Sequence, residues 1–206
     1  MPPIVSEEYK EKKKKEILQS ALACFAKKGY EVATIDDIVA QSGISKGAIY
    51  NYFKSKDEIY LELMTADTDD TMEVLKNNLL TCKSSLEKIK YLFKEYSSIN
   101  PFEKVNIDKA IVHYEFRLHS SRDEELVEIM KKRREHIFLE LITSIIKEGQ
   151  ESGEFDSSLD RYVYANMFWS IIDGVTIQTV YKSYPYHSVL SELQTMFIGK
   201  LLSGKN

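Results

Sequence analysis

The chain has 206 residues, 43% of them hydrophobic, with a formal net charge of −4 and only four prolines and eight glycines. This apolar share is too high for a disordered chain, and the scarcity of turn residues favours long helices over a sheet-rich fold. No apolar run approaches the ~20 residues that cross a bilayer, and the charged N-terminus lacks a signal-peptide pattern. The two cysteines show no metal-ligand spacing. Together these features predict a cytoplasmic, all-helical protein with reduced thiols.

The first predicted helix runs from about Glu8 to Lys28. Apolar residues recur at helical spacing from Ile17 to Phe25, and Gly29 supplies the stop. Residues 1–60 carry ten lysines against nine acidic residues, whereas the remainder is clearly acidic. The run from Lys12 to Lys15 is either an electrostatic arm for a nucleic-acid backbone or a solvated helix start, and both interpretations stay open.

Two short helices with a tight turn are predicted within residues 34–56 (TIDDIVAQSGISKGAIYNYFKSK). Thr34 and Asp37 have the spacing of a capping box, Gly43 ends the first of these helices at a site that favours positive φ, and Ser45 caps the second. The residues expected to face inward are Ile35, Ile38, Val39, Ile44, Ile49 and Phe53, and those expected to face outward are Lys46, Gly47, Tyr50 and Asn51. This is the pattern of a helix-turn-helix, whose second helix enters the major groove of DNA.

Longer amphipathic segments follow. Ser55 and Glu58 open a fourth helix that runs past Leu63, and apolar residues at helical spacing mark further helices near residues 85–98, 102–119, 126–146, 160–175 and 190–202. The sequence therefore predicts about nine helices. We expect a helix-turn-helix DNA-binding domain over residues 1–54 and a helical ligand-binding and dimerisation domain over residues 55–206.

Residues 12–62 resemble the N-terminal domain of the TetR family of bacterial transcriptional regulators. The matching residues are Ala21, Phe25, Ala26, Gly29, Tyr30, Thr34, Ile35, Ile38, Ala40 and the run from Gly43 to Tyr60. The resemblance implies an all-helical homodimer that binds a palindromic operator in double-stranded DNA. It also implies repression that is relieved by an unknown small-molecule inducer bound in the C-terminal domain. Beyond this region only the layout agrees, including Gly149 and Gly153 before the last two helices.

The resemblance also implies DNA-contacting roles for nine residues. These are Thr34, Ser45, Lys46, Gly47, Ala48, Tyr50, Asn51, Tyr52 and Lys56. Their chemistry agrees, because Lys46 can donate to guanine O6 and N7 and Tyr50 can pack on a thymine methyl group or bond to a phosphate. Gly47 and Ala48 offer little direct readout, so DNA shape would supply part of the specificity. Asp36 departs from this scheme, since its carboxylate would repel phosphate unless it turned away.

Several of these residues have a second interpretation. Thr34 and Ser45 serve as helix caps whether or not they also touch phosphate. Tyr52 fits a half-buried side chain as well as a DNA-facing one. Lys56 would hold a phosphate at the start of the fourth helix, where the helix dipole helps.

The C-terminal region is where an effector would bind. Candidate pocket residues are Tyr91, His113, Tyr114, Phe116, Arg117, Met167, Phe168, Trp169 and Asp173, although apolar residues at helical spacing are more often plain core. Polar groups mark a pocket better, because an unpaired buried one is costly, and this favours His113, Arg117 and Asp173. A cavity faced by Asp173 or Glu115 would suit cationic effectors. The predicted dimer interface comprises Asn166, Ser170, Gly174, Gln178, Leu193 and Phe197.

Neither a cofactor nor catalysis is predicted. Glu115 and His119 are four residues apart and could chelate a metal from one helix face, but no further ligand at zinc-like spacing accompanies them. We find no Gly-rich phosphate loop, nucleophile elbow or Ser/His/Asp arrangement. The alternative to a DNA-binding regulator is a helical ligand-binding or adaptor module whose basic N-terminal helices contact protein.

Overall fold

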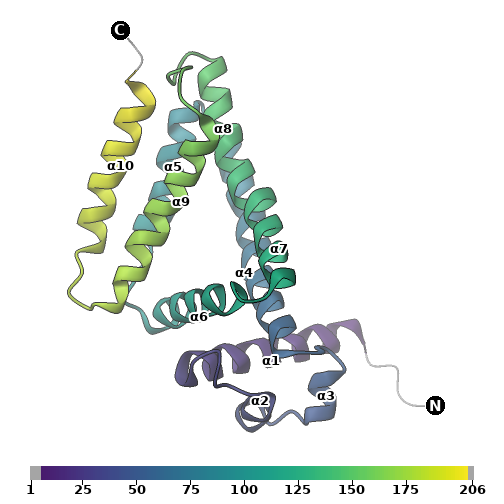
Figure 1. The fold of residues 1–206 in the computed structure, drawn as a ribbon. Helices are drawn as coiled ribbons and strands as arrows, with labels where there is room; N and C mark the ends of the chain where they lie inside the picture. The colour runs from purple at the N-terminus through teal and green to yellow at the C-terminus, as the bar shows by residue number, and fades with distance from the viewer. Residues whose placement is uncertain (1–5, 204–206) are drawn as a thin grey trace. The chain divides into compact units, whose positions relative to one another are not determined.

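The computed structural model describes residues 6–203, apart from the side chains of residues 67 and 69–71. Within that range all regular structure is helical (Figure 1). The α-helices are α1 (Glu7–Lys28), α2 (Ile35–Ser42), α3 (Lys46–Tyr50), α4 (Lys56–Leu79), α5 (Ser85–Ser98), α6 (Lys104–Ser120), α7 (Glu124–Arg133), α8 (Glu140–Glu151), α9 (Arg161–Ile177) and α10 (Tyr186–Leu202). The predicted all-helical fold is confirmed. The helix predicted near residues 126–146 is divided into α7, a π-helical turn (Arg134–Leu139) and α8.

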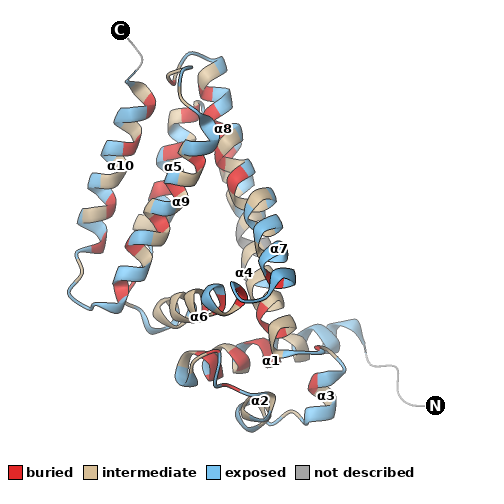
Figure 2. Cartoon of the chain, viewed as in Figure 1, coloured by how far each residue is buried: buried red, intermediate tan, exposed pale blue. Residues whose placement is uncertain are grey.

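The helices pack into two compact units. The first contains α1 to α3, α4 up to residue 73, and residues 108–119 of α6; the second contains the rest of the chain. In both units the buried residues follow one side of each amphipathic helix (Figure 2). The predicted division of roles at residue 54 concerns function, and it stays a prediction.

An aromatic cluster forms the core of the first unit. The Tyr30 ring centroid lies 5.0 Å from those of both Phe25 and Phe116, and the rings of Tyr60 and Phe116 stack at 3.7 Å. All four residues are at most 1% exposed. Because burying one such side chain contributes roughly 1.5–3 kcal/mol, this cluster holds α1 and the turn after it on α4 and α6.

A second aromatic cluster forms the core between α5, α9 and α10. The ring centroids of Phe93, Phe168 and Phe197 lie 4.9–6.0 Å apart, and each residue is at most 2% exposed. Phe197 was predicted at a dimer interface, but its side chain is buried within one protomer and offers no surface to a partner. Near this core, Glu154 accepts hydrogen bonds from the Ser85 and Leu86 N–H groups and so caps α5.

Candidate nucleic-acid interface and effector region

A left-handed glycine separates the two short helices of the predicted helix-turn-helix. Gly43 has φ +69° and donates its N–H to the Val39 carbonyl, which ends α2. The Ser45 hydroxyl then accepts the Ala48 N–H at 3.3 Å and caps α3. Ile49 and Phe53 are buried, as predicted, and α3 ends at Tyr50.

The side of α3 opposite the core faces solvent. Lys46, Gly47, Tyr50 and Asn51 are exposed, with Tyr50 at 47%, whereas Ala48 and Tyr52 are half-buried. The arrangement leaves polar groups free to approach a groove, and the contacts themselves stay predictions.

The predicted capping box at the start of α2 is present. The Thr34 hydroxyl accepts the Asp37 N–H at 3.2 Å, and the Asp37 carboxylate accepts the Thr34 N–H at 3.0 Å. Lys28, at the end of α1, donates to the same carboxylate at 2.6 Å. The hydrogen bond from Lys28, followed by those from Thr34, lowers the pKa of Asp37 to about 2.

Acid should therefore weaken the helix-turn-helix through Asp37. Its pKa in the folded chain lies below the ordinary value of 3.8, so its stabilising contribution is present above pH 3.8 and is lost as the pH falls toward about 2. The difference in unfolding free energy between the unmodified chain and Asp37→Asn should shrink over that window, as measured by denaturant unfolding at each pH. A difference that stayed constant from neutral pH to pH 2 would contradict this account.

Lys46 and Asp36 form an ion pair at the edge of this surface. The Lys46 Nζ lies 2.8 Å from Asp36 Oδ1 and 3.0 Å from Oδ2, joining the first residue of α3 to the first turn of α2. The hydrogen bond that Lys46 donates to Asp36, followed by the negative charge of that carboxylate, raises the pKa of Lys46. From the sequence we expected the Asp36 carboxylate to repel phosphate, and the spacing gave no sign of its bond with Lys46.

Lys56 is held inside the first unit. Its Nζ donates to the carbonyl oxygens of Tyr30, Glu31 and Ala33 at 2.6, 3.0 and 3.1 Å, and it lies 4.5 Å from the Tyr30 ring centroid. These bonds occupy all three protons of the ammonium and fix the turn between α1 and α2. The predicted phosphate contact of Lys56 would require one of these bonds to be given up, and it stays a prediction.

The end of α6 is bonded to the same turn. The Tyr30 N–H donates to Glu115 Oε2 at 2.6 Å, beside Gly29, which has φ +83°. His119 places Nδ1 2.7 Å from Glu31 Oε2 and Nε2 3.5 Å from Asp57 Oδ1. The two residues considered as a metal-chelating pair thus have separate partners.

Sequence spacing carried no sign of these bonds, since Tyr30 and Glu115 are 85 positions apart. Tyr30 also donates its hydroxyl to Asp57, and burial together with this bond raises the Tyr30 pKa far above its usual range. Among the residues that the structure describes, no group of three or more His, Cys, Asp or Glu side chains could hold a metal ion.

The basic run on α1 is partly neutralised. Lys13 pairs with Glu16 at 2.6 Å, and Lys14 pairs with Glu62 of α4. Lys12 and Lys15 are exposed. The interpretation of this run as an arm for a nucleic-acid backbone stays open, with those two lysines as its main candidates.

The predicted effector-pocket residues fall in both units. His113, Tyr114, Phe116 and Arg117 belong to the first unit, and Tyr91, Met167, Phe168, Trp169 and Asp173 belong to the second. Phe116 and Phe168 are fully buried in the two aromatic clusters, whereas Met167 is 41% exposed. The candidates are therefore divided between the two units, and their role in effector binding stays a prediction.

Several polar candidates have partners of their own. His113 Nδ1 lies 3.2 Å from the Tyr60 hydroxyl and 3.2 Å from Met64 Sδ. The Trp169 indole donates to the Phe138 carbonyl at 3.0 Å, within the π-helical turn. π-Helical turns are common at functional sites because they release backbone groups from the helical ladder. This supports Trp169 as a residue to probe for effector binding.

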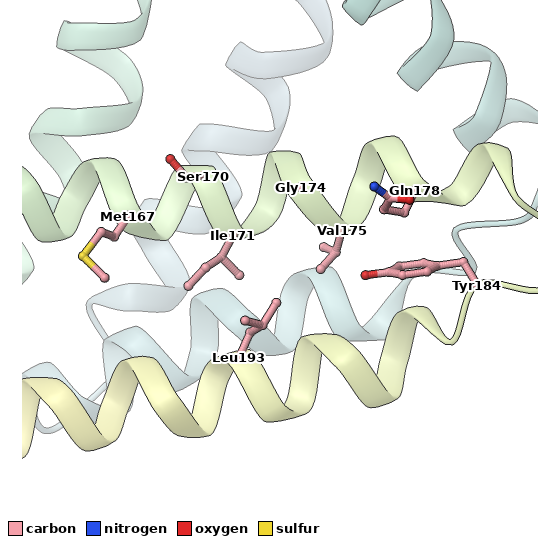
Figure 3. Close-up of a pocket in the computed structure, with 8 residues that line it drawn as sticks. All are labelled: Met167, Ser170, Ile171, Gly174, Val175, Gln178, Tyr184 and Leu193. Atoms are coloured by element: carbon pink, nitrogen blue, oxygen red, sulfur yellow. The ribbon is translucent and has the colours of Figure 1, made fainter.

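An open pocket of about 540 Å³ runs along α9 (Figure 3). Its lining residues are Met167, Ser170, Ile171, Gly174, Val175, Gln178, Tyr184 and Leu193. Ile171 and Val175 point toward α10, and Leu193 points back toward α9. Four of the residues predicted for the dimer interface, Ser170, Gly174, Gln178 and Leu193, therefore line one surface.

The fifth predicted interface residue is tied to a neighbouring helical turn. The Asn166 side chain accepts a hydrogen bond from Arg134 at 2.7 Å and donates to the Tyr162 carbonyl at 2.8 Å. On the same two helices, Val163 and Ile177 of α9 and Met196 of α10 are 37–66% exposed. Exposed apolar side chains that gather on one surface are typical of an interface between proteins.

No described helix is long and apolar enough to span a membrane.

Two family models match the chain. One, described as bacterial regulatory proteins of the tetR family, matches residues 17–63, which hold the helix-turn-helix. The other, described as a tetracyclin repressor-like C-terminal domain, matches residues 88–184. Together they include both α3 and most of the α9 surface.

Curated relatives and solved structures agree. The chain is 32% identical to the HTH-type transcriptional regulator QacR of Staphylococcus aureus, over 69% of this chain and 73% of that protein. It is 28% identical to the HTH-type regulator YfiR of Bacillus subtilis, over 88% and 86%. The structure of FadR from Bacillus subtilis, in complex with stearoyl-CoA, superposes with a TM-score of 0.77 at 22% identity, covering 93% of this chain and 99% of that one. A regulator from Saccharomonospora viridis, in complex with choline, superposes with a TM-score of 0.72 at 21% identity, over 91% and 94%.

Proposed function

Because this chain belongs to the tetR family of bacterial regulatory proteins, we propose that it represses transcription from a palindromic operator until a small-molecule effector releases it. Members of this family are helix-turn-helix transcriptional regulators that bind DNA and ligands. The observation that carries the proposal is α3, which buries Ile49 while Lys46, Gly47, Tyr50 and Asn51 remain open to solvent. In this role the protein acts in the cytoplasm and needs no catalytic step.

Two copies would act together through the surface of α9 and α10. The pocket lined by Ser170, Gly174 and Leu193, together with the exposed apolar side chains of α9 and α10, supports a homodimer. A two-fold pair would present its two copies of α3 about 34 Å apart, which matches successive major grooves of a palindrome. Thr34, Ser45 and the exposed residues of α3 would then contact each half-site.

The effector would bind in the helical region that follows the helix-turn-helix. FadR of Bacillus subtilis and the regulator of Saccharomonospora viridis carry stearoyl-CoA and choline, which differ widely in size and charge. We therefore propose only that the effector is a small molecule, and the residues to probe are His113, Arg117, Trp169 and Asp173. To release the operator, the effector must bind the non-DNA-binding conformation of the protein more tightly than the DNA-binding one.

The test of DNA binding is its dependence on salt and on Tyr50. Affinity for a duplex selected by the protein from a random pool should fall steeply with added salt, because phosphate contacts release counterions. Tyr50→Ala should weaken binding by about tenfold or more while the oligomeric state and the thermal midpoint stay unchanged, since this side chain is 47% exposed. Fluorescence anisotropy measures the affinity, sedimentation measures the oligomeric state, and thermal unfolding measures the midpoint.

Either of two results would contradict the proposal. A chain that enriches no duplex, or whose weak binding is insensitive to salt, would favour the adaptor alternative. Dissociation of the dimer by Tyr50→Ala would show that this residue packs against a subunit instead of DNA.

A further inference from the structure

The ion pair between Asp36 and Lys46 lies on the surface proposed to face DNA. We propose that Asp36 is a specificity-determining residue, which holds the Lys46 ammonium for a guanine and suppresses binding to other sequences. This inference rests on the proposed function. Its geometric basis is the placement of Lys46 Nζ 2.8 and 3.0 Å from the two oxygens of the Asp36 carboxylate.

Both partners are exposed and remain available to a ligand. The side chains of Lys46 and Asp36 are 52% and 70% exposed, so neither belongs to the protein core. Lys46 and Tyr50 are four residues apart in α3 and therefore share one helix face, which is open to solvent. Asp36 reaches this face from α2, and it bonds neither of the two backbone groups of the capping box, which Asp37 and Thr34 satisfy.

Charge determines what this pair does to binding of any duplex. A free lysine is attracted to every phosphate regardless of sequence. A lysine and a carboxylate that form a pair have no net charge together, and the carboxylate repels a DNA backbone that passes close by. Asp36 therefore lowers the affinity that all sequences share.

Geometry determines what the pair does to binding of the right sequence. A lysine side chain is flexible and acts on its own as a point charge with little directional preference. An ammonium has three protons, and donation to Asp36 leaves two for acceptors such as guanine O6 and N7. Asp36 thus positions Lys46, and the loss of sequence-independent affinity is offset only where a guanine accepts those protons. Specificity, as a difference between two affinities, increases.

The experiment compares Asp36→Asn with the unmodified chain on two duplexes. One is the duplex enriched from a random pool by the unmodified chain, and the other is a scrambled duplex of equal length and base composition. Asp36→Asn should bind the scrambled duplex about five- to tenfold more tightly near 0.1 M salt, with a salt slope steeper by about one. Affinity for the selected duplex should change by less than about twofold, so the ratio of the two affinities falls.

Matched variants separate charge from position. Glu140→Gln removes one exposed carboxylate from α8, outside the proposed dimer surface, and should leave the ratio unchanged, because it alters only the net charge. Asp36→Glu keeps the carboxylate and should restore most of the discrimination. Selection repeated with Asp36→Asn and with Lys46→Met should yield the same weakened preference at one guanine of each half-site. Thermal unfolding checks that each variant folds.

The outcomes distinguish this inference from the proposed function. Enrichment of no duplex by the unmodified chain would remove the proposed function itself. Enrichment of a duplex, followed by an Asp36→Asn variant with an unchanged affinity ratio and an unchanged base preference, would overturn the role of Asp36 alone.

Discussion

Gly174→Arg should yield a monomer whose affinity for the selected duplex is about a hundredfold or more below that of the unmodified dimer. Gly174 is exposed on α9 and lines the open pocket, and no heavy atom lies within 4 Å of the position that a Cβ would occupy. An arginine therefore fits within one protomer. It blocks close approach of a second copy, and two half-sites are then no longer bound as one unit.

The protomer itself should gain from this change, because glycine within a helix is about 1 kcal/mol less favourable than a good helix former. Sedimentation equilibrium measures the assembly, and anisotropy with the selected duplex measures the affinity. Leu80→Arg is the matched control, since Leu80 is 82% exposed and lies outside the predicted interface. A Gly174→Arg chain that remained dimeric would place the interface elsewhere.

Gly149→Ala should destabilise the second unit by about 2 kcal/mol, because an overpacking cost of about 3 kcal/mol exceeds a helix-propensity gain of about 1 kcal/mol. A Cβ at this position would lie 2.1 Å from Phe155 Cδ2 and 2.4 Å from Cε2. The ring is 3% exposed, and the Phe155 N–H donates to the Gly149 carbonyl at 2.9 Å. Because both its side chain and its backbone are held, Phe155 cannot move aside without disturbing the core.

The measurement is the thermal midpoint, which should fall by about 4–8 °C for a loss of this size. Gly199→Ala is the matched control, since Gly199 is an exposed glycine of α10 with no atom within 4 Å of a built Cβ. The control should be neutral or slightly stabilising. Equal midpoints for the two variants would mean that Phe155 relaxes freely and that Gly149 carries no packing role.

The sequence was most informative where interactions are local. A capping box depends on residues three positions apart, and Thr34 and Asp37 form the predicted one. The left-handed glycine at Gly43 and the buried positions Ile38 and Ile49 were likewise predicted, because turn geometry and helical periodicity are properties of a short stretch of chain.

It was least informative where the partner lies far along the chain. Phe197 has the same apolar pattern whether it faces a second subunit or its own core, and only packing against Phe93 and Phe168 decides between them. Lys56 looked like a free cation at a helix start, yet the carbonyls that bind it come from the turn between α1 and α2.

The amino-acid sequence by itself determined the all-helical fold, the helix-turn-helix and the family, because periodicity, caps and turn residues act over a few neighbouring positions. Only the tertiary structure decided how the polar side chains are paired, including Asp36 with Lys46 and Tyr30 with Glu115. The physical reason is range: an ion pair or a buried ring needs a partner within a few ångströms in space, and sequence distance does not report which helices meet.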